Sequence, residues 1–309
     1  MSLPKLPARA AYLRLNAPLN APGNNLITLE ALNSLRQQLI DYNTPPDENK
    51  PLLLPEFGSN VFRQAFKYAR KRSTPMRKQY AWVQDTSEWQ KRRSSLPKVL
   101  VLRSEGPVFS RGYNLKEQEH MSSKELLQIY RRCADVVSLI RQSPIPVVGV
   151  IHGLASGPGA QLALTTDLPV AIASAQFQLP GMSVGLPCTL SSVALSRRLG
   201  SAFTYRMLAL GEPVRADELP PGTVETVADE AALEKRVSEI VEKLAEHSSG
   251  QAQAMGKWAY WTQAAMRDPN SDATASRWAA EVTAIHAGTG DAIEGIQAFN
   301  DKRVPAWHT

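Results

Sequence analysis

The sequence predicts an α/β fold in which strand–turn–helix units are followed by a helical region. Two short apolar runs, KVLVLRS at 98–104 and PIPVVGVIHG at 144–153, have the length and the β-branched content of buried strands. Apolar residues at helical spacing follow these runs and dominate the chain after Ser201. No internal repeat of fixed period accompanies these elements.

The first half of the chain contains one strand and two helices besides the two runs. Residues 11–16, AYLRLN, alternate apolar and polar side chains as a strand does. Residues 27–42 have leucines at helical spacing, with Thr28 as a plausible N-cap. A capping box, Ser122 with Glu125, opens a helix that we expect to end near Gln142. Its predicted buried face consists of Leu126, Ile129, Cys133, Val137 and Ile140.

The second half begins with a glycine-flanked turn, LASGPGAQLA, which continues into a short helix. Strand pieces follow at 168–174 and 176–181, and then a helix through residue 200. We divide the chain into a core at 1–200, carrying an insertion at about 44–97, and a helical region at 201–309. Within that region the helix at 229–247 has one apolar stripe, made by Leu233, Val237, Ile240, Val241 and Leu244.

Composition excludes several classes of protein. The chain has 309 residues, 43% hydrophobic and 21% charged, and no run of 18 apolar residues, so we expect no membrane span. Its two cysteines, Cys133 and Cys188, imply no disulfide framework and a reducing compartment, and hence a protein that is not secreted. No Cys–His pattern has zinc-ligand spacing, so we predict no metal.

Three segments carry a family resemblance. VLRSEGPVFSRGYNLKE at 101–117, the run from Pro144 to Pro180, and EGIQAFNDKRVPAW at 294–307 occur in that order. Together they resemble the crotonase (enoyl-CoA hydratase/isomerase) superfamily, closest to the branch called enoyl-CoA hydratase domain-containing protein 3. The resemblance implies a spiral of ββα units with C-terminal helices that build a homotrimer or hexamer. It also implies a coenzyme A thioester as substrate, with no further cofactor.

The resemblance also implies an oxyanion hole made of two backbone N–H groups. The first falls on Tyr113. The second falls on Pro158, which has no N–H, so that donor is lost unless Gly157 or Gly159 substitutes for it. The loss of one such donor costs roughly 10²–10³ in rate.

Enoyl-CoA hydration needs two carboxylates that hold and deprotonate one water. By the resemblance, their positions fall on Gln161 and Gly181, and a third acidic position of relatives falls near Thr189. None of these residues is an acid. Cys188, in the loop that faces the acyl group in relatives, could serve as a nucleophile if its pKa were lowered.

Other polar residues admit both a functional and a structural interpretation. A base could come from Glu117, Glu119 or His120. The simpler interpretation is that these residues lie on a solvent-exposed segment that leads into the next helix. For His152 and Asp167 we expect structural roles. By the resemblance, residues that line coenzyme A are Tyr113, Asn114, Leu115 and Lys116, with Lys302 and Arg303 reaching phosphate from a neighbouring subunit.

The basic insertion admits three interpretations. Ten Lys or Arg residues and only two acids lie between Arg63 and Arg93, so the net charge of this segment alone is larger than the +6 of the whole chain. It could be a solvated surface loop or a source of cations for coenzyme A phosphates. It could also bind RNA through residues 63–93, with Tyr68, Tyr80, Trp82 and Trp89 stacking on bases.

The sequence therefore predicts a divergent acyl-CoA isomerase, decarboxylase or thioesterase-type enzyme. Decarboxylation fits the residues best, because it needs an oxyanion hole but no base to start it. The alternative is a catalytically inactive scaffold that serves in regulation or RNA binding. The basic N-terminus, with Lys5, Arg9 and Arg14, leaves the mitochondrial matrix and the cytoplasm both open.

Overall fold

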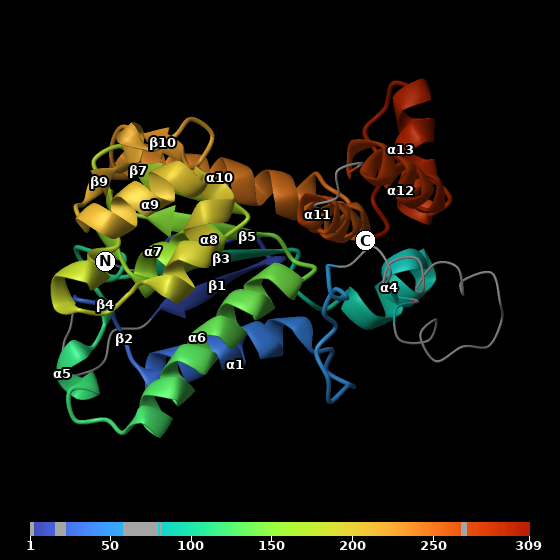
Figure 1. Ribbon diagram of the computed structural model, residues 1–309. Coiled ribbons are helices and arrows are strands. Elements are labelled where there is room, and N and C mark those ends of the chain that lie inside the picture. The colour runs from blue at the N-terminus through green and yellow to red at the C-terminus, as the bar shows by residue number, and fades with distance from the viewer. Residues whose placement is uncertain (1–2, 16–22, 58–79, 81, 267–270) are drawn as a thin grey trace. The chain divides into compact units, whose positions relative to one another are not determined.

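The protein is described by a computed structural model that covers residues 3–15, 23–57, 80, 82–266 and 271–309 (Figure 1). Most of the basic stretch 63–93, including Tyr68, lies outside the described residues. The chain forms two compact units. The first contains Met1–Asp41, Val99–Arg141 and Val147–Glu242, and the second contains Tyr42–Lys98, Gln142–Pro146 and Lys243–Thr309. The predicted division at residue 200 falls inside the first unit, and it stays a prediction.

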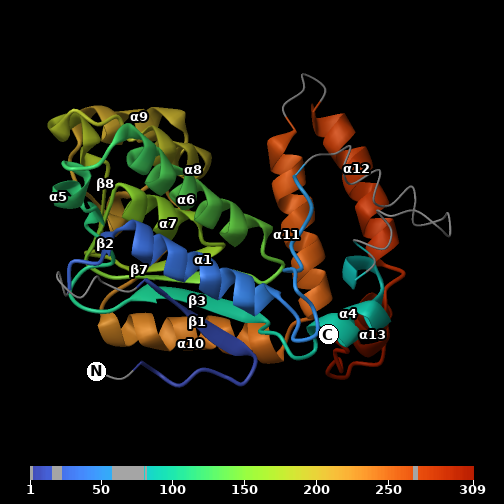
Figure 2. The ribbon, with the colours of Figure 1, turned by 90° about the horizontal axis from the view of Figure 1, so that it is seen from below.

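The first unit is built on a parallel sheet in the order β1-β3-β5-β7-β10. Helices cover both of its faces, with α1 (Leu29–Asn43), α6 (Ser123–Gln142) and α7 (Pro158–Thr165) on one side and α10 (Glu230–Glu246) on the other (Figure 2). A parallel sheet covered in this way must be apolar on both faces, which explains the continuous apolar runs in the sequence. The strands are β1 (Ala10–Leu15), β3 (Val99–Ser104), β5 (Val147–Ile151), β7 (Leu168–Ile172) and β10 (Glu225–Val227).

Two smaller sheets are formed by residues that follow strands of the main sheet in the sequence. They hold the turns that form the site. Strand β2 (Leu26–Ile27) pairs with β4 (Gly112–Tyr113), and both run in the same direction. Strand β6 (Leu154–Ser156) pairs in parallel with β8 (Gln176–Gln178), which pairs antiparallel with β9 (Val214–Arg215). Thus the strand that precedes each predicted ligand-binding turn is held by its own short ladder.

The helix starts that the sequence predicts in the first half of the chain are confirmed. Thr28 Oγ1 accepts a hydrogen bond from the N–H of Ala31 at 3.1 Å, at the start of α1 (Leu29–Asn43). Ser122 and Glu125 form the predicted capping box, with Ser122 N–H donating to Glu125 Oε2 at 2.8 Å. The helix they open, α6 (Ser123–Gln142), ends where predicted.

The later elements are partly as predicted. The α10 stripe is buried except for Leu244, which is half-buried. However, β9 and β10 lie within the region after Ser201 that the pattern indicated to be helical. The remaining elements of this unit are α5 (Leu115–Gln118), α7 (Pro158–Thr165), the 3-10 helices η1 (Pro180–Val184) and η2 (Ala216–Glu218), α8 (Thr189–Leu199), α9 (Ser201–Leu210) and α10 (Glu230–Glu246).

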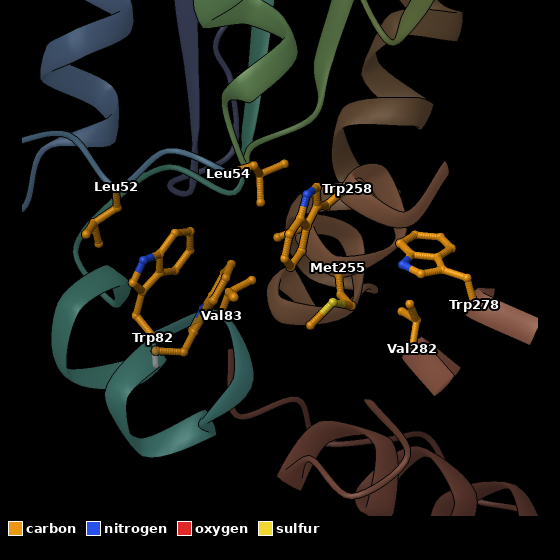
Figure 3. Close-up of a cluster of buried hydrophobic side chains, with 10 residues drawn as sticks. Leu52, Leu54, Trp82, Val83, Met255, Trp258, Trp278 and Val282 are labelled. Atoms are coloured by element: carbon orange, nitrogen blue, oxygen red, sulfur yellow. The ribbon is translucent and has the colours of Figure 1, made fainter. Parts of the chain in front are cut away.

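The second unit has a core of tryptophans (Figure 3). Trp82 and Trp89 pack with ring centroids 5.6 Å apart, and Trp258 and Trp278 are fully buried in the same cluster. The Arg93 guanidinium lies 5.7 Å from the Trp82 ring centroid and 5.2 Å from that of Trp89. The helices of this unit within the described residues are α4 (Thr86–Arg93), α11 (Gly250–Ala265), α12 (Ser271–His286) and α13 (Gly290–Asn300).

The interpretation of 44–97 as a surface insertion is therefore wrong for much of its described part. Leu52, Leu54, Trp82 and Trp89 are each 5% exposed or less. Their side chains contribute to a hydrophobic core, and in the sequence they are separated from α11 and α12 by more than 150 positions, so no local pattern reveals the packing. Within the described part of the chain, no helix has both the length and the apolar character needed to cross a membrane.

Candidate functional site

An open pocket of about 480 Å³ lies in the first unit, where the predicted turns meet. Its walls come from the β4 turn, the outer face of α6, the N-terminus of α7, and the segment from η1 into α8. The lining residues are Arg111, Gly112, Tyr113, Leu115, Leu127, Tyr130, Arg131, Ala134, Ser156, Gly157, Pro158, Pro180, Gly181, Val184, Leu186, Pro187, Cys188, Thr189, Leu190 and Ser191.

The first turn presents the backbone N–H of Tyr113. Gly112 has φ +90°, a conformation that favours glycine, and its N–H donates to Ser110 Oγ at 3.1 Å. The next-but-one N–H, from Asn114, donates to the carbonyl of Ile27 at 3.3 Å. Tyr113 itself lines the pocket, and the oxyanion-hole role of its N–H stays a prediction.

The second turn presents no matching donor in the pocket. Gly157 has φ +52°, and its N–H donates to the carbonyl of Gln178 at 2.8 Å. Pro158 follows as the first residue of α7, a favoured position for proline because its fixed φ suits the helix. Gly159 is buried against Ser110 and is not among the lining residues. The geometry therefore favours loss of the second donor over its displacement.

The two positions at which relatives place carboxylates differ in their surroundings. Gln161 is 1% exposed, and its Oε1 accepts a hydrogen bond from the Cys133 thiol at 3.7 Å. Gly181 does line the pocket, but a Cβ built on it would lie 1.9 Å from the Leu186 carbonyl oxygen and 2.6 Å from Cys188 Sγ. The 186–188 backbone thus fills the space that a side chain at position 181 would need.

Neither cysteine has the lowered pKa of a nucleophile. Burial raises the pKa of the Cys188 thiol, and the nearby Gly181 N–H offsets this only in part. Burial also raises the pKa of Cys133 to about 11. Both thiols therefore stay protonated near neutral pH.

The charges of the pocket are all positive. Among the described lining residues none is Asp, Glu or His, and the two charged ones are Arg111 and Arg131, both exposed. The 117–120 segment does not contribute to the lining, so the bases considered there do not reach the pocket. His152 and Asp167 are tied to backbone instead: His152 Nε2 lies 2.8 Å from the Gly106 carbonyl oxygen, and Asp167 accepts from the Val147 N–H at 2.8 Å.

The predicted coenzyme A residues are placed unevenly, and their role stays a prediction. Tyr113 and Leu115 line the pocket, whereas Asn114 and Lys116 do not. In the second unit, Lys302 is exposed and has φ +54°. Arg303 makes a bidentate pair with Glu294, with Nη1–Oε1 at 2.6 Å and Nη2–Oε2 at 3.0 Å.

Sequence reasoning missed four lining side chains on or beside α6 and the first turn. Arg131 and Leu127 are spaced four apart on the exposed face of the helix, so their shared face was readable from the sequence. Arg111 precedes the turn glycine. Tyr130 packs edge-on against Tyr113, with ring centroids 5.3 Å apart and planes at 71°, and nothing in the sequence signals that contact.

The aromatic residues offered for RNA stacking are placed otherwise. Trp82 and Trp89 are buried in the second unit's core, and Tyr80 packs against it. Arg92 is paired with Glu48, with Nη2–Oε2 at 2.5 Å. These described residues therefore give RNA no stacking platform, and they offer no support for this hypothesis.

Comparison with known proteins identifies what the chain is similar to. The sequence profile of the enoyl-CoA hydratase/isomerase family matches residues 90–309. The rat protein named enoyl-CoA hydratase domain-containing protein 3, mitochondrial, is 35% identical over 212 residues, 68% of this chain and 69% of that protein. The human protein of the same name is 34% identical over 212 residues, 68% of each.

Solved structures agree with this assignment. The crystal structure of human enoyl coenzyme A hydratase domain-containing protein 3 matches with a TM-score of 0.68 and 27% identity, covering 92% of both chains. That of a putative enoyl-CoA hydratase from Streptomyces coelicolor has a TM-score of 0.71 at 25% identity, over 98% of this chain and 92% of that one. The predicted crotonase-type α/β fold with a helical C-terminal region is confirmed.

Proposed function

Because the chain belongs to the enoyl-CoA hydratase/isomerase family, we propose that its pocket binds an acyl-CoA thioester and decarboxylates a carboxylated acyl group. One observation carries the proposal. The described lining of the pocket contains Tyr113, whose N–H the resemblance assigns to the oxyanion hole, but neither a carboxylate nor an imidazole. Such a site can stabilise an enolate oxygen but has no base with which to create the enolate.

The missing base separates the reactions of this family. Hydration requires a group that deprotonates water, and isomerisation requires one that removes a proton from carbon. Thioester hydrolysis needs an activated nucleophile, and burial keeps Cys188 a thiol. Decarboxylation needs no base, since the electron pair of the breaking C–C bond forms the enolate as carbon dioxide leaves. It is the reaction that the remaining groups can support.

The pocket's polarity also suits an anionic ligand. Arg111 and Arg131 are exposed, where they can attract the phosphates of coenzyme A or a carboxylate from solution. The rest of the lining is largely apolar, with Leu127, Pro180 and Leu186 among its members. A carboxylate moved from the arginines into this apolar region loses hydration, which favours its departure as neutral carbon dioxide.

A titration followed by an activity assay tests the proposal. Acetoacetyl-CoA, whose enolate resembles the charged intermediate, should bind in the micromolar range, about −8 kcal/mol. Malonyl-CoA and methylmalonyl-CoA should release carbon dioxide, while crotonyl-CoA should not be hydrated. Arg131→Gln should weaken binding about tenfold, and the matched variant Arg197→Gln, on the exposed face of α8, should not. Hydration of crotonyl-CoA at family-like rates would refute the proposal.

Binding without any turnover would favour the inactive scaffold instead.

For the assembly and location of the protein we propose a homotrimer or dimer of trimers in the mitochondrial matrix. Support comes from the family's assembly, from relatives whose names include "mitochondrial", and from the basic residues Lys5 and Arg9 before β1. Light scattering of the purified protein and fractionation of cells that express the tagged chain test the two parts separately.

A further inference from the structure

Tyr113 lines the pocket and its phenolic hydroxyl is buried, and among the described residues its one hydrogen-bonding neighbour is the Cys133 thiol, a weak acceptor outside strict hydrogen-bond geometry. Its ring is held edge-on against Tyr130, whose own hydroxyl donates to Gln118 Oε1 at 3.3 Å. A buried hydroxyl without a strong partner costs free energy, so such a group on a pocket-lining residue indicates a role with a ligand.

The surroundings of the hydroxyl place it near the two positions where relatives carry carboxylates. Burial raises the pKa of Tyr113 most, and the neighbouring thiols of Cys133 and Cys188 raise it further. The Cys133 thiol donates a hydrogen bond to Gln161 Oε1, and Cys188 Sγ lies 2.6 Å from the place of a Cβ on Gly181. The Tyr113 hydroxyl therefore occupies the region left without acids.

We infer that the Tyr113 hydroxyl is the proton donor that completes the reaction at the α-carbon of the bound thioester. This inference rests on the proposed decarboxylation. As carbon dioxide leaves, the electron pair of the C–C bond forms the enolate, whose oxygen accepts the hydrogen bond of the Tyr113 N–H. The α-carbon then takes the proton from the hydroxyl, and the phenolate regains a proton from water entering the open pocket. One residue would thus serve both ends of the enolate.

The protonation state of the hydroxyl suits a donor and excludes a base. Burial raises the pKa of Tyr113, so the phenol is neutral throughout the physiological range. The α-carbon of a thioester is a weaker acid than a phenol, so transfer to the enolate carbon is downhill even from this phenol. Removal of a proton from substrate would require the phenolate, which the buried site disfavours.

Tyr113→Phe tests the inference, because it keeps the ring and the backbone N–H and removes only the hydroxyl. With methylmalonyl-CoA in D₂O, we expect kcat to fall 10²–10⁴-fold and KM to change less than threefold. We expect wild-type propionyl-CoA to carry deuterium in one configuration and the variant's product to be racemic, because solvent then protonates the enolate. Tyr205→Phe, an exposed tyrosine on α9, should match wild type in every measurement.

Two outcomes overturn the inference. If Tyr113→Phe retains kcat within threefold, or still delivers deuterium to one face, the hydroxyl is not the donor. If the wild type does not decarboxylate any carboxylated acyl-CoA, the proposed function fails and the inference fails with it. Folding is checked independently: the variant loses a buried hydroxyl that has no strong partner, so it should melt near or above the wild-type temperature and bind acetoacetyl-CoA normally. A lower melting temperature would instead assign Tyr113 a structural role.

Discussion

The Gly157 N–H donates to the Gln178 carbonyl oxygen at 2.8 Å, so β8 occupies the one donor that the glycine before Pro158 could have offered. The proline itself has no N–H, and Gly159 is buried against Ser110. In consequence the N-terminus of α7 offers the pocket neither a Pro158 donor nor a free Gly157 donor.

Pro158→Gly should therefore restore a donor. We expect acetoacetyl-CoA to bind about tenfold more tightly, since a hydrogen bond to a charged group contributes about 1.5–3 kcal/mol. Turnover should rise by as much as 10²-fold. Stability should fall by about 0.5–1 kcal/mol because glycine increases the entropy of the unfolded chain. Titration calorimetry and chemical denaturation measure these effects. Unchanged affinity would mean that another amide, such as that of Gly159, already serves the ligand.

Gly181 cannot accept even one carbon atom without movement of the backbone. Gly181→Ala should lower the free energy of unfolding by about 2–3 kcal/mol, because its Cβ would overlap the Leu186 carbonyl oxygen. Gly256→Ala is the matched control: its Cβ meets nothing within 4 Å in α11, and it should be neutral or stabilise by about 0.5–1 kcal/mol. Both values come from urea denaturation. Equal effects at the two sites would contradict the crowding at position 181.

The cysteines should react slowly with alkylating reagents. Because burial raises the pKa of Cys188, iodoacetamide at pH 7 should modify it more slowly than a free thiol, with a rate that increases above pH 9. Cys133, with a pKa of about 11, should react only after unfolding. Mass spectrometry of labelled peptides with and without guanidinium distinguishes the two. Rapid labelling of Cys188 at pH 7, accompanied by loss of activity, would restore the nucleophile hypothesis.

Acid should weaken the C-terminal end of the second unit through Glu294. Its hydrogen bond with Arg303 lowers the pKa of the carboxyl from 4.5 to about 2. A lowered folded-state pKa adds stability above the unfolded value, and that contribution is lost as the pH falls from about 4.5 through 2. The wild type should therefore have a larger free energy of unfolding than Glu294→Gln above this window, and the difference should disappear as the pH falls across it. The difference between the wild type and Arg303→Gln should disappear in the same way. If the free energies of unfolding of wild type and Glu294→Gln, measured by chemical denaturation at each pH, stay parallel down to pH 2, the pair contributes nothing to stability.

The sequence was sufficient for features that depend on local chemistry. Apolar runs of strand length predicted β3 and β5 because a parallel sheet buries both of its faces. The Ser122–Glu125 spacing predicted the start of α6 because a capping box satisfies the free donors of a helix N-terminus. The lack of acids at Gln161 and Gly181 was also evident from the sequence, once the family's motifs had aligned those positions.

Only the tertiary structure decided what depends on contacts between distant residues. Trp82 and Trp89 look like exposed aromatics among charges, yet they pack with Trp258 and Trp278 far along the chain. The Gly157–Gln178 hydrogen bond and the crowding of Gly181 by Leu186 depend on backbone paths that composition does not encode. The buried hydroxyl of Tyr113 likewise results from how α6 and the first turn pack together. Local spacing predicts elements, whereas burial and pairing arise from the three-dimensional packing of those elements.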